Sequence, residues 1–558
     1  MNSGGFDEGS QTVFAAAMRA RDSGDRALAA ALFGRALASA PDDPNVIYNY
    51  GLFLISGGEA DLACRILNEA YARSPGDAML ASGLGIALRS SGRYALAEQI
   101  WRTLAAAMPG RPQPLYELGQ CLAGQAKPEE SVEPFRAALA AAQGTEQRDL
   151  LWKAYLLALA YADGIDPQLV RDENRRRATE LAPADPVAGH DNDPDPSRRL
   201  RIGYVSSDFR FHSVARTMEA LFSRHDRSRY EIFAYAHNAI VDEVTEKFRS
   251  MADSWFSTVG LDDAAVARRI RADRIDVLVT SAAHFDENRL GIALHRPAPV
   301  QISIYDSAPT GSDAFDGLIV DPAMAGGGDD HPSERLLRLR SMYFHPPLAL
   351  APPVSQPPVL TNGYVTFGSA NHPSKFSRRT FTLWASALRA VPGSRLRLKS
   401  GTRYDEPSMR DALRARFAEL GIERDRLHFD RGDLGLAAHL SFYGRIDIAL
   451  DTTPFNGATT TFESLWMGVP VVALRGRTIM SRWASAVLAR VGRPDWAADD
   501  EAQFARLAAE LAASAPSQDR AKLRACVGSS TMCDAGRHAR DYERIYRALW
   551  RRWCRRQR

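Results

Sequence analysis

The stretch DIALDTTPFNGATTTFESLWMGVPVV, Asp447 to Val472, places a Pro-Phe-Asn-Gly turn and three consecutive threonines between two apolar runs. The first run, Ile446 to Leu450, is typical of a buried strand, and the residues from Thr459 onward predict a helix. Glu463 lies near the first turn of that helix, where the helix dipole favours a carboxylate. The stretch therefore predicts a strand, a turn and a helix, which is the repeating pattern of a parallel α/β sheet.

The turn within this stretch predicts an anion site. A glycine-containing turn that opens a helix leaves backbone N–H groups unpaired, and the helix dipole adds positive potential. Beyond Asn456 and Gly457, the hydroxyls of Thr459, Thr460 and Thr461 can add hydrogen-bond donors. The alternative is N-capping by one threonine, with the other two incidental. The sequence carries neither a Gly-x-Gly-x-x-Gly motif nor a P-loop lysine, which disfavours dinucleotide and P-loop sites.

Strand and helix patterns alternate on both sides of this stretch. β-rich runs predict a first parallel sheet from residues 200–205, 230–235, 276–280, 300–305 and 317–320, and a second from 364–368, 395–399, 427–429, 447–450 and 470–474. A proline-rich segment, Phe344 to Pro358, separates them. We therefore predict two Rossmann-like domains at 200–345 and 360–527, and a basic C-terminal helix at 528–558. Ligands of such sheets bind at the carboxyl ends of the strands, so the cleft between the domains is the expected site.

The first third of the chain repeats with a period of 34 residues. Glycines, prolines and alanines recur at this interval: Gly24, Gly58 and Gly92; Ala29, Ala63 and Ala97; Pro41, Pro75 and Pro109; Gly51, Gly85 and Gly119. Small residues let two helices approach closely, and proline ends each unit. The pattern resembles the tetratricopeptide repeat, an α-solenoid, and predicts units at 8–41, 42–75, 76–109 and 110–143. A degenerate helical pair at 146–181 is expected to cap the array, which gives a domain at 8–182 and a linker at 183–199.

Stacked repeats of this kind form a concave groove that binds peptides or proteins. We therefore expect the array to recruit a protein partner. The alternatives are a rigid spacer or a dimerisation surface, so the sequence is compatible with an oligomer. The repeats carry no catalytic constellation.

Composition and charge narrow the functional classes. The chain has 558 residues, of which 45% are hydrophobic and 25% charged, with a formal net charge of +3. This small charge disfavours a dedicated nucleic-acid binder, although the tail Arg537 to Arg558 is basic and forms either a solvated helix face or a patch for an anionic partner. The five cysteines show neither metal-ligand nor disulfide spacing. With no visible secretion signal and no apolar run of membrane length, we expect a cytoplasmic protein.

Five segments together resemble the O-linked N-acetylglucosamine transferase family, in which tetratricopeptide repeats precede a GT-B glycosyltransferase. They are IGYVSSDFRFHS (202–213), ALHRPAPVQIS (293–303), VTFGSANHPSKFS (365–377), DIALDTTPFNGATTTFESLWMGVPVV (447–472) and SR (481–482), in the family order. The resemblance spans residues 20–525, repeats included. It implies transfer of a sugar from a nucleotide-sugar, usually UDP-GlcNAc, to Ser or Thr of a protein, without a metal or other cofactor.

The resemblance also assigns site residues. Lys375 corresponds to a lysine that contacts the donor diphosphate, where its ammonium offsets charge on the leaving group. His212 corresponds to a histidine near the sugar and acceptor, as a general base or as a positioning group. Asp208 is expected to hold its loop by hydrogen bonds, and His439 corresponds to a histidine close to the nucleotide. The segment that contacts phosphate and ribose comprises Asn456, Gly457, Ala458, Thr459, Thr460, Thr461 and Glu463.

The chain departs from the family pattern around the base and the sugar. Ala458 stands where the family commonly has histidine, and Leu436 and Phe442 stand where basic residues flank the nucleotide-side histidine. Two glycine-containing loops of the family are replaced by 283–285 and 306–311. These changes suggest a second donor class, a CMP-linked nonulosonic acid such as pseudaminic or legionaminic acid, as in flagellin glycosyltransferases.

We therefore predict a bacterial-type protein O-glycosyltransferase whose repeats recruit a protein acceptor, with flagellin as one such acceptor. One alternative is a scaffold that binds nucleotide or protein without catalysis, which the presence of both His212 and Lys375 disfavours. Another is glycosylation of a small molecule or a glycan, with the repeats serving assembly.

Overall fold

The computed structural model describes residues 8–184, 189–285, 287–306, 308–326, 332–432 and 435–558. The chain forms two compact units, one of residues 1–143 with 402–413 and the other of 144–401 with 414–558. Within the described ranges, no helix is long and apolar enough to cross a membrane.

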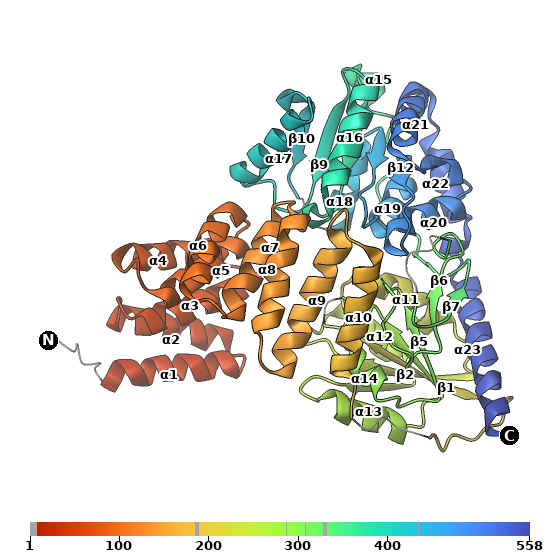
Figure 1. The fold of residues 1–558 in the computed structure, drawn as a ribbon, viewed down its shortest axis with the longest axis horizontal. Coiled ribbons are helices and arrows are strands. Elements are labelled where there is room, and N and C mark those ends of the chain that lie inside the picture. Colours follow the sequence, from red (N-terminus) through yellow and green to blue (C-terminus); the bar gives the residue numbers. More distant parts are fainter. Residues whose placement is uncertain (1–7, 185–188, 286, 307, 327–331, 433–434) are drawn as a thin grey trace. The chain divides into compact units, whose positions relative to one another are not determined.

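The first unit is an array of helical pairs, in the red and orange part of Figure 1. Between residues 8 and 141 the described chain forms α1 (Glu8–Asp22), α2 (Arg26–Ser39), α3 (Pro44–Ser56), α4 (Ala60–Arg73), α5 (Ala78–Ser90), α6 (Tyr94–Ala107), α7 (Pro112–Gly124) and α8 (Pro128–Ala141). The short turns between helices fall at the predicted glycines; Gly58 and Gly92 have φ angles of +81° and +82°, which favour glycine.

The pairs α3–α4, α5–α6 and α7–α8 are each closed by a glycine that meets a large side chain, while α1 has Ala17 at the equivalent position. A Cβ added to Gly85 of α5 would lie 2.6 Å from Trp101 Cε2 of α6, and one added to Gly51 of α3 would lie 2.6 Å from Leu67 Cδ1 of α4. Both large side chains are fully buried. These large side chains recur after 34 residues, as the glycines do, so the sequence period reflects the packing contact within each pair. The predicted α-solenoid is confirmed.

The next helical pair, α9 (Thr145–Tyr161) and α10 (Pro167–Leu181), belongs to the second unit. The sequence predicts a cap for the repeats, but α10 packs against α14 (Leu290–Leu294). A Cβ added to Gly311 would lie 2.5 Å from the carbonyl carbon of Asn174 in α10, so a loop of the first sheet is fitted closely to this helix. The pair therefore packs on the α/β part of the chain.

The first parallel sheet has the strand order β3-β2-β1-β4-β5-β6-β7. Its strands are β1 (Leu200–Ser206), β2 (Tyr230–Ala236), β3 (Ser254–Ser257), β4 (Val277–Ser281), β5 (Val300–Ile304), β6 (Gly317–Val320) and β7 (Leu336–Arg338). Helices α11 (Ser213–Arg224), α12 (Glu243–Met251) and α13 (Asp263–Ala272) connect them. In β1, Val205 pairs with Tyr235 of β2 and with Thr280 of β4.

The second parallel sheet has the order β10-β9-β8-β11-β12-β13. Its strands are β8 (Thr366–Ser369), β9 (Arg395–Lys399), β10 (Leu427–Asp430), β11 (Ile448–Leu450), β12 (Val471–Leu474) and β13 (Ala497–Ala498). The helices around it are α15 (Val359–Asn362), α16 (Arg378–Ala390), α17 (Pro407–Glu419), α18 (Leu436–Ser441), α19 (Thr459–Trp466), α20 (Trp483–Arg490), α21 (Glu501–Ser514) and α22 (Arg520–Gly528). The two predicted Rossmann-like sheets are confirmed. In each, the strand order reverses beside a central strand, β1 or β8, where ligands of such sheets bind.

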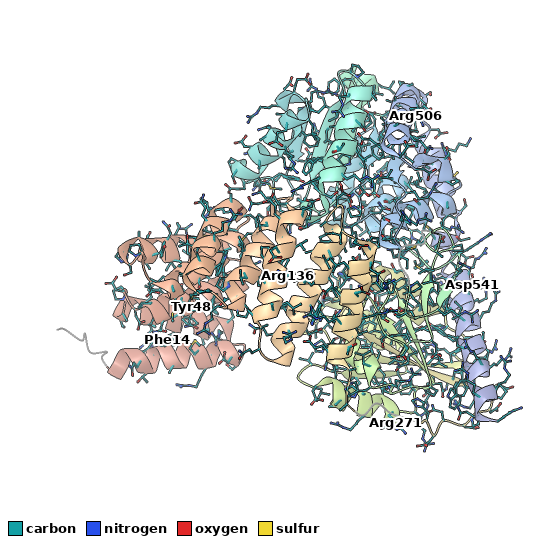
Figure 2. The ribbon with its side chains drawn as sticks, viewed as in Figure 1. Phe14, Tyr48, Arg136, Arg271, Arg506 and Asp541 are labelled. Atoms are coloured by element: carbon teal, nitrogen blue, oxygen red, sulfur yellow. The ribbon has the colours of Figure 1, made fainter. Side chains whose placement is uncertain are left out.

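The C-terminal helix, α23 (Ala535–Gln557), returns to the first sheet. Tyr546 Oη lies 2.9 Å from Tyr204 Oη of β1, and the Ser341 hydroxyl donates to the Asp541 carboxylate at 2.7 Å. Figure 2 labels Asp541 on this helix. The apolar face of the helix is therefore part of the core, while its arginines at 540, 544, 551, 555 and 558 are exposed.

The segment predicted as a linker is partly fixed in place. Arg198 Nη1 donates to Asp276 Oδ2 at 2.8 Å, and Asn192 Nδ2 donates to Asp276 Oδ1 at 2.8 Å. Asp276 directly precedes β4 and is fully buried. Residues 189–199 thus lie against the first sheet, and 185–188 lie outside the described residues.

Candidate active site

A cavity of about 410 Å³ lies where loops from the carboxyl ends of both sheets meet. We call it the central cavity. It brings together six predicted site residues: His212, Lys375, Asn456, Ala458, Thr459 and Thr460. The chain segments that supply them follow β1, β8 and β11, so the strand order places them at one site.

His212 forms the N-cap of α11 on the first-sheet side of the central cavity. Its backbone is extended, with φ −149° and ψ 155°, and the Val214 N–H lies 3.3 Å from its Nδ1 atom. The same Nδ1 atom lies 3.3 Å from Asp208 Oδ1. Nδ1 of a neutral ring makes one of these two contacts at a time: it accepts from the Val214 N–H when the ring proton is on Nε2, and it donates to Asp208 when it carries that proton itself. The second tautomer is the one that leaves Nε2 able to accept a proton. The geometry therefore fits a ring held for proton transfer at Nε2.

Asp208 is fully buried in a polar network. Asn288 Nδ2 donates to its Oδ2 at 2.9 Å, and the Ser206 hydroxyl accepts from the Asp208 N–H at 3.0 Å. These hydrogen bonds keep the carboxylate in one place beneath His212. The network agrees with the loop-holding role expected for Asp208.

Lys375 lies on the opposite wall, at the end of a short 3₁₀ helix, Pro373–Lys375, after β8. Its Nζ atom lies 4.3 Å from the ring centroid of Phe455. Within the described residues, no carboxylate lies within 4.0 Å of Nζ. The ammonium group therefore faces the cavity with an aromatic ring as its neighbour, which leaves its charge available to an anion.

Burial shifts the pKa values of Lys375 and Asp451 in opposite directions. Desolvation lowers the pKa of the Lys375 ammonium to about 8, and the Asp451 carboxylate opposes that change. Desolvation likewise raises the pKa of Asp451 above its ordinary value, against the hydrogen bonds it accepts and the charge of Lys375. An anion bound beside Lys375 would offset the desolvation of the ammonium and restore its pKa.

The predicted anion turn is organised by Asp451. The Gly457 N–H donates to Asp451 Oδ1 at 2.8 Å, and the Thr461 hydroxyl donates to the Gly457 carbonyl at 2.9 Å. Thr461 is 2% exposed, so its hydroxyl closes the turn and does not reach the cavity. Asn456 Nδ2 donates to the Thr452 carbonyl at 2.8 Å, while its buried Oδ1 has no partner among the described residues.

Helix α19 begins without a side-chain cap. Its N-cap residue, Ala458, has φ −108° and ψ −69°, and its methyl side chain makes no cap bond to the first turn. The first threonine, Thr459, lines the central cavity, and the Thr460 hydroxyl donates to Asn371 Oδ1 at 3.1 Å. The N–H groups of the first turn therefore remain open to an anion, as the sequence predicts.

His439 and Glu463 form a pair that does not line the central cavity. His439 Nε2 lies 3.0 Å from Glu463 Oε2, and Arg216 Nη1 of α11 lies 3.5 Å from Glu463 Oε1. The buried carboxylate therefore connects α19 to a helix of each sheet, α18 and α11. Contact between these two residues and the nucleotide stays a prediction.

Aromatic residues that sequence reasoning missed surround the cavity. Phe455 lies 4.8 Å from Tyr161 of α9 and 6.0 Å from Phe285, centroid to centroid. Tyr305, Tyr343 and Trp483 also line it. Phe455 is part of the stretch that predicts the turn, but nothing in the pattern indicates that α9 lies opposite it. Within the described part of the chain, no three His, Cys, Asp or Glu side chains cluster as a metal site.

The sequence profile described as glycosyl transferase family 41 matches residues 184–345 and 356–542 of the chain. The chain belongs to glycosyl transferase family 41. Both parallel sheets and the loops of the central cavity lie within the matched residues. The predicted resemblance to this group of transferases is thereby confirmed.

Relatives of this family 41 chain include plant proteins named probable UDP-N-acetylglucosamine–peptide N-acetylglucosaminyltransferase SPINDLY. The protein of Petunia hybrida is 36% identical over 382 residues, which are 65% of this chain and 40% of the relative. The protein of Solanum lycopersicum is 36% identical over 420 residues, 72% of this chain and 44% of the relative. The chain thus spans less than half the length of these curated relatives.

A solved structure resembles the whole family 41 chain. It is a mutant O-GlcNAc transferase of Thermobaculum terrenum, with 30% identity, a TM-score of 0.80 and 98% of each chain covered. The similarity includes the helical array as well as the two sheets.

Proposed function

We propose that the protein is an O-glycosyltransferase that moves a sugar from a nucleotide-activated donor to a Ser or Thr hydroxyl of a protein. The observation that carries this proposal is the central cavity. It places a histidine on one wall, and an ammonium group and an uncapped helix N-terminus on the other. Family membership supports the same chemistry.

The donor phosphate would bind between Lys375 and the first turn of α19. Backbone N–H groups at a helix N-terminus attract anions, and the ammonium adds a full positive charge. The Asp451 carboxylate supports this arrangement, because it accepts from the Gly457 N–H at 2.8 Å and so holds the conformation of the turn. Its raised pKa limits the negative charge that it brings near the phosphate.

The reaction exchanges one C–O bond for another. The acceptor hydroxyl oxygen attacks the anomeric carbon, the bond from that carbon to the phosphate oxygen breaks, and the nucleotide leaves with the bonding electrons. His212 Nε2 takes the hydroxyl proton, or holds the hydroxyl in line for attack. Lys375 and the N–H groups of α19 stabilise the charge that develops on the leaving phosphate. Because the Lys375 ammonium and the N–H groups stabilise the leaving phosphate, we expect activity without a metal ion.

The first candidate donor is UDP-GlcNAc, which is the donor in the names of the plant relatives. A CMP-linked nonulosonic acid is the second candidate, and the observation that favours it is Ala458 at the cavity wall in place of the family's histidine. The acceptor is a protein that the repeats recruit, with flagellin as one to be tried. A cytoplasmic location fits both nucleotide-sugars.

A thermal-shift panel tests the donor class. The full chain is heated with UDP, CMP, GDP and their sugars, each in separate samples with and without EDTA. A ligand that binds only the folded state raises the melting temperature, by an amount set by its concentration over Kd. We expect one nucleotide to stand out and EDTA to change nothing. No shift with any nucleotide would contradict the proposal and support a scaffold.

Intact-mass analysis with the selected donor and a candidate acceptor then tests transfer. A mass increase of N-acetylhexosamine with UDP-GlcNAc would eliminate the nonulosonic acid candidate. Transfer only to a small molecule or a glycan would eliminate the protein acceptor.

A further inference from the structure

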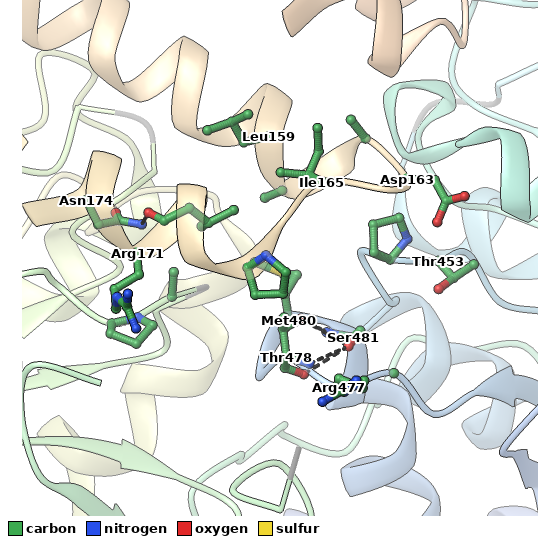
Figure 3. A pocket seen from close by; sticks show the side chains of 18 of the residues that line it. Leu159, Asp163, Ile165, Arg171, Asn174, Thr453, Arg477, Thr478, Met480 and Ser481 are labelled. Atoms are coloured by element: carbon green, nitrogen blue, oxygen red, sulfur yellow. Dashed lines mark hydrogen bonds between the residues drawn. The ribbon is translucent and has the colours of Figure 1, made fainter. Parts of the chain in front are cut away.

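A second cavity, of about 450 Å³, lies beside the central cavity (Figure 3). We call it the flanking cavity. Met480 lines both, and the loop after β11 separates them, with Thr453 and Pro454 facing the flanking cavity and Phe455 and Asn456 facing the central one. The donor chemistry proposed above places no group in this second space.

Helix α10 and loops of both sheets form the walls of the flanking cavity. The turn between α9 and α10, residues 162–167, and the exposed face of α10 form one wall. The loops after β5, β11 and β12 form the others together with Arg379 of α16, and they include Gly311, Thr453 and Arg477. Figure 3 shows Leu159 and Ile165 on the helical side, and Arg477, Thr478 and Ser481 opposite them. Since loops from both sheets contribute, the cavity opens at the same edge as the proposed reaction.

The walls carry more positive than negative charge. Five arginines line the cavity against two aspartates: Arg171, Arg175, Arg379, Arg475 and Arg477 against Asp163 and Asp499. Asp499 forms an ion pair with Arg475, so it is already neutralised. Arg175 and Arg379 are exposed and have no ion-pair or hydrogen-bond partner among the described residues. The net positive potential is therefore available to a ligand.

One buried polar atom on the wall also lacks a partner. Asn174 of α10 is 4% exposed; its Nδ2 donates to the Val170 carbonyl at 2.8 Å, while its Oδ1 has no partner among the described residues. A buried acceptor left unpaired is unfavourable, so the site favours a ligand that donates a hydrogen bond to it. A peptide N–H is such a donor. Figure 3 shows Asn174 beside Arg171 on the same wall.

We propose that the flanking cavity binds an extended, acidic segment of the acceptor protein beside the modified Ser or Thr. Aspartate and glutamate side chains would pair with Arg175 and Arg379, and a backbone N–H would donate to Asn174 Oδ1. The apolar lining, which includes Leu159, Ile165 and Pro309, suits the stems of an extended peptide. This inference rests on the proposed function, because it supplies that reaction with its acceptor.

Peptide binding without donor tests the inference separately from catalysis. Three fluorescein-labelled peptides share a central threonine and differ in its flanks, which are Asp and Glu, Asn and Gln, or Lys. Anisotropy with the full chain at low salt should rank the acidic peptide first, about tenfold tighter than the neutral one, and added salt should reduce the difference. A labelled oligonucleotide of the same length is the competing anion.

Charge reversal locates the site. R175E and R379E should each remove most of the preference for acidic flanks, while R268E, an exposed arginine on α13 outside both cavities, should leave it unchanged. N174A should weaken the acidic and neutral peptides equally, since Asn174 contacts the backbone. The nucleotide-induced thermal shift of each variant checks that the fold and the central cavity are intact.

Two sets of results would overturn the inference. One is equal or no binding of all three peptides, or tighter binding of the oligonucleotide. The other is an equal effect of R379E and R268E. If the nucleotide panel is silent while acidic peptides bind through Arg175 and Arg379, the proposed transferase fails and the acidic-peptide site stands. If one nucleotide gives a thermal shift and the peptides show no preference, the proposed transferase stands and the acidic-peptide site fails.

Discussion

Two helices begin at the central cavity, and their first turns differ. Helix α11, after β1, has an extended N-cap residue, His212, whose ring accepts from the Val214 N–H. Helix α19, after β11, has Ala458 at the same position, with ψ −69° and no side-chain cap. In α11 the Val214 N–H donates to a side chain of the site, whereas in α19 the N–H groups of the first turn remain available to a ligand. One wall thus presents an imidazole and the other a positive potential.

This difference gives the cavity a direction. Proton removal belongs to the capped side and phosphate binding to the uncapped side, so the sugar must lie between them. The loops that hold each side are buried polar networks, built around Asp208 on one wall and Asp451 on the other. Two carboxylates in similar places therefore support opposite tasks.

Replacing Lys375, on the phosphate side of the cavity, should cause the largest loss of activity. K375A is expected to lower kcat about 10²- to 10³-fold, because a preorganised charge at the leaving group is lost. K375R keeps the charge and should retain more activity than K375A. Rates under saturating donor separate this effect from binding; equal activity of K375A and the unaltered protein would remove Lys375 from the reaction.

The pKa of Lys375 predicts a pH dependence of donor binding. Burial lowers this pKa to about 8 in the empty protein, so the ammonium is present below that pH and is lost as the pH rises through it. Nucleotide affinity, measured by calorimetry, should therefore weaken above about pH 8. K375M should bind weakly with no such dependence, and a decline of the same size in K375M would assign it to another group.

Replacing His212 tests the capped side, with an expected loss of about 10²-fold in kcat for H212A, the lower end of what a general base contributes. H212N is the matched control, because asparagine is a good N-cap and can accept from the Val214 N–H. If His212 is the base, both variants lose activity. If it only positions and caps, H212N stays active.

T460V should have a smaller effect on the uncapped side. The substitution removes the hydrogen bond from the Thr460 hydroxyl to Asn371 Oδ1 at 3.1 Å and preserves the side-chain shape. A loss of about 0.5–1.5 kcal/mol in the free energy of unfolding is expected. Urea unfolding measures it, and T179V, at an exposed threonine on α10, is the control.

The smallest effect is expected from A458S, which offers α19 a capping hydroxyl. Capping side chains act from an extended backbone, and Ala458 has φ −108° and ψ −69°. The change in the free energy of unfolding should therefore stay below about 0.5 kcal/mol. A stabilisation of about 1 kcal/mol, with weaker nucleotide binding, would show that the turn relaxes to make a cap and competes with the anion.

The inner strands of both sheets are predictable from sequence, because most are apolar on both faces and β9, Arg395–Lys399, alternates basic and apolar residues. The strands that sequence reasoning missed, β3, β7 and β13, are all edge strands. Edge strands are covered on one side only, so their residues need not form an apolar run; β3 reads Ser-Trp-Phe-Ser and is only partly buried. The helical array was predictable for another reason, since its period records contacts within each pair.

The candidate site was predictable in its location more than in its detail. Strand, turn and helix in one stretch place Asn456 to Thr460 at a sheet edge. Thr461 turns inward through a local bond to the Gly457 carbonyl, which the threonine run alone does not distinguish from an outward hydroxyl. That Glu463 pairs with His439 and Arg216 depends on helices α18 and α11, which lie outside this stretch. The place of α9 and α10 was missed for the same reason, since a degenerate helical pair after helical pairs predicts a cap for the array.

The C-terminal helix affects how the protein can form during synthesis. Its residues Tyr542 and Tyr546 are fully buried, and Tyr546 lies against Tyr204 of the first strand of the first sheet. The ribosome makes Tyr204 342 residues before Tyr546, although domains otherwise tend to fold in the order of their synthesis. The first α/β domain therefore exposes part of its core until this helix has been made, and the growing chain depends on a segment made much later to bury what it has already built.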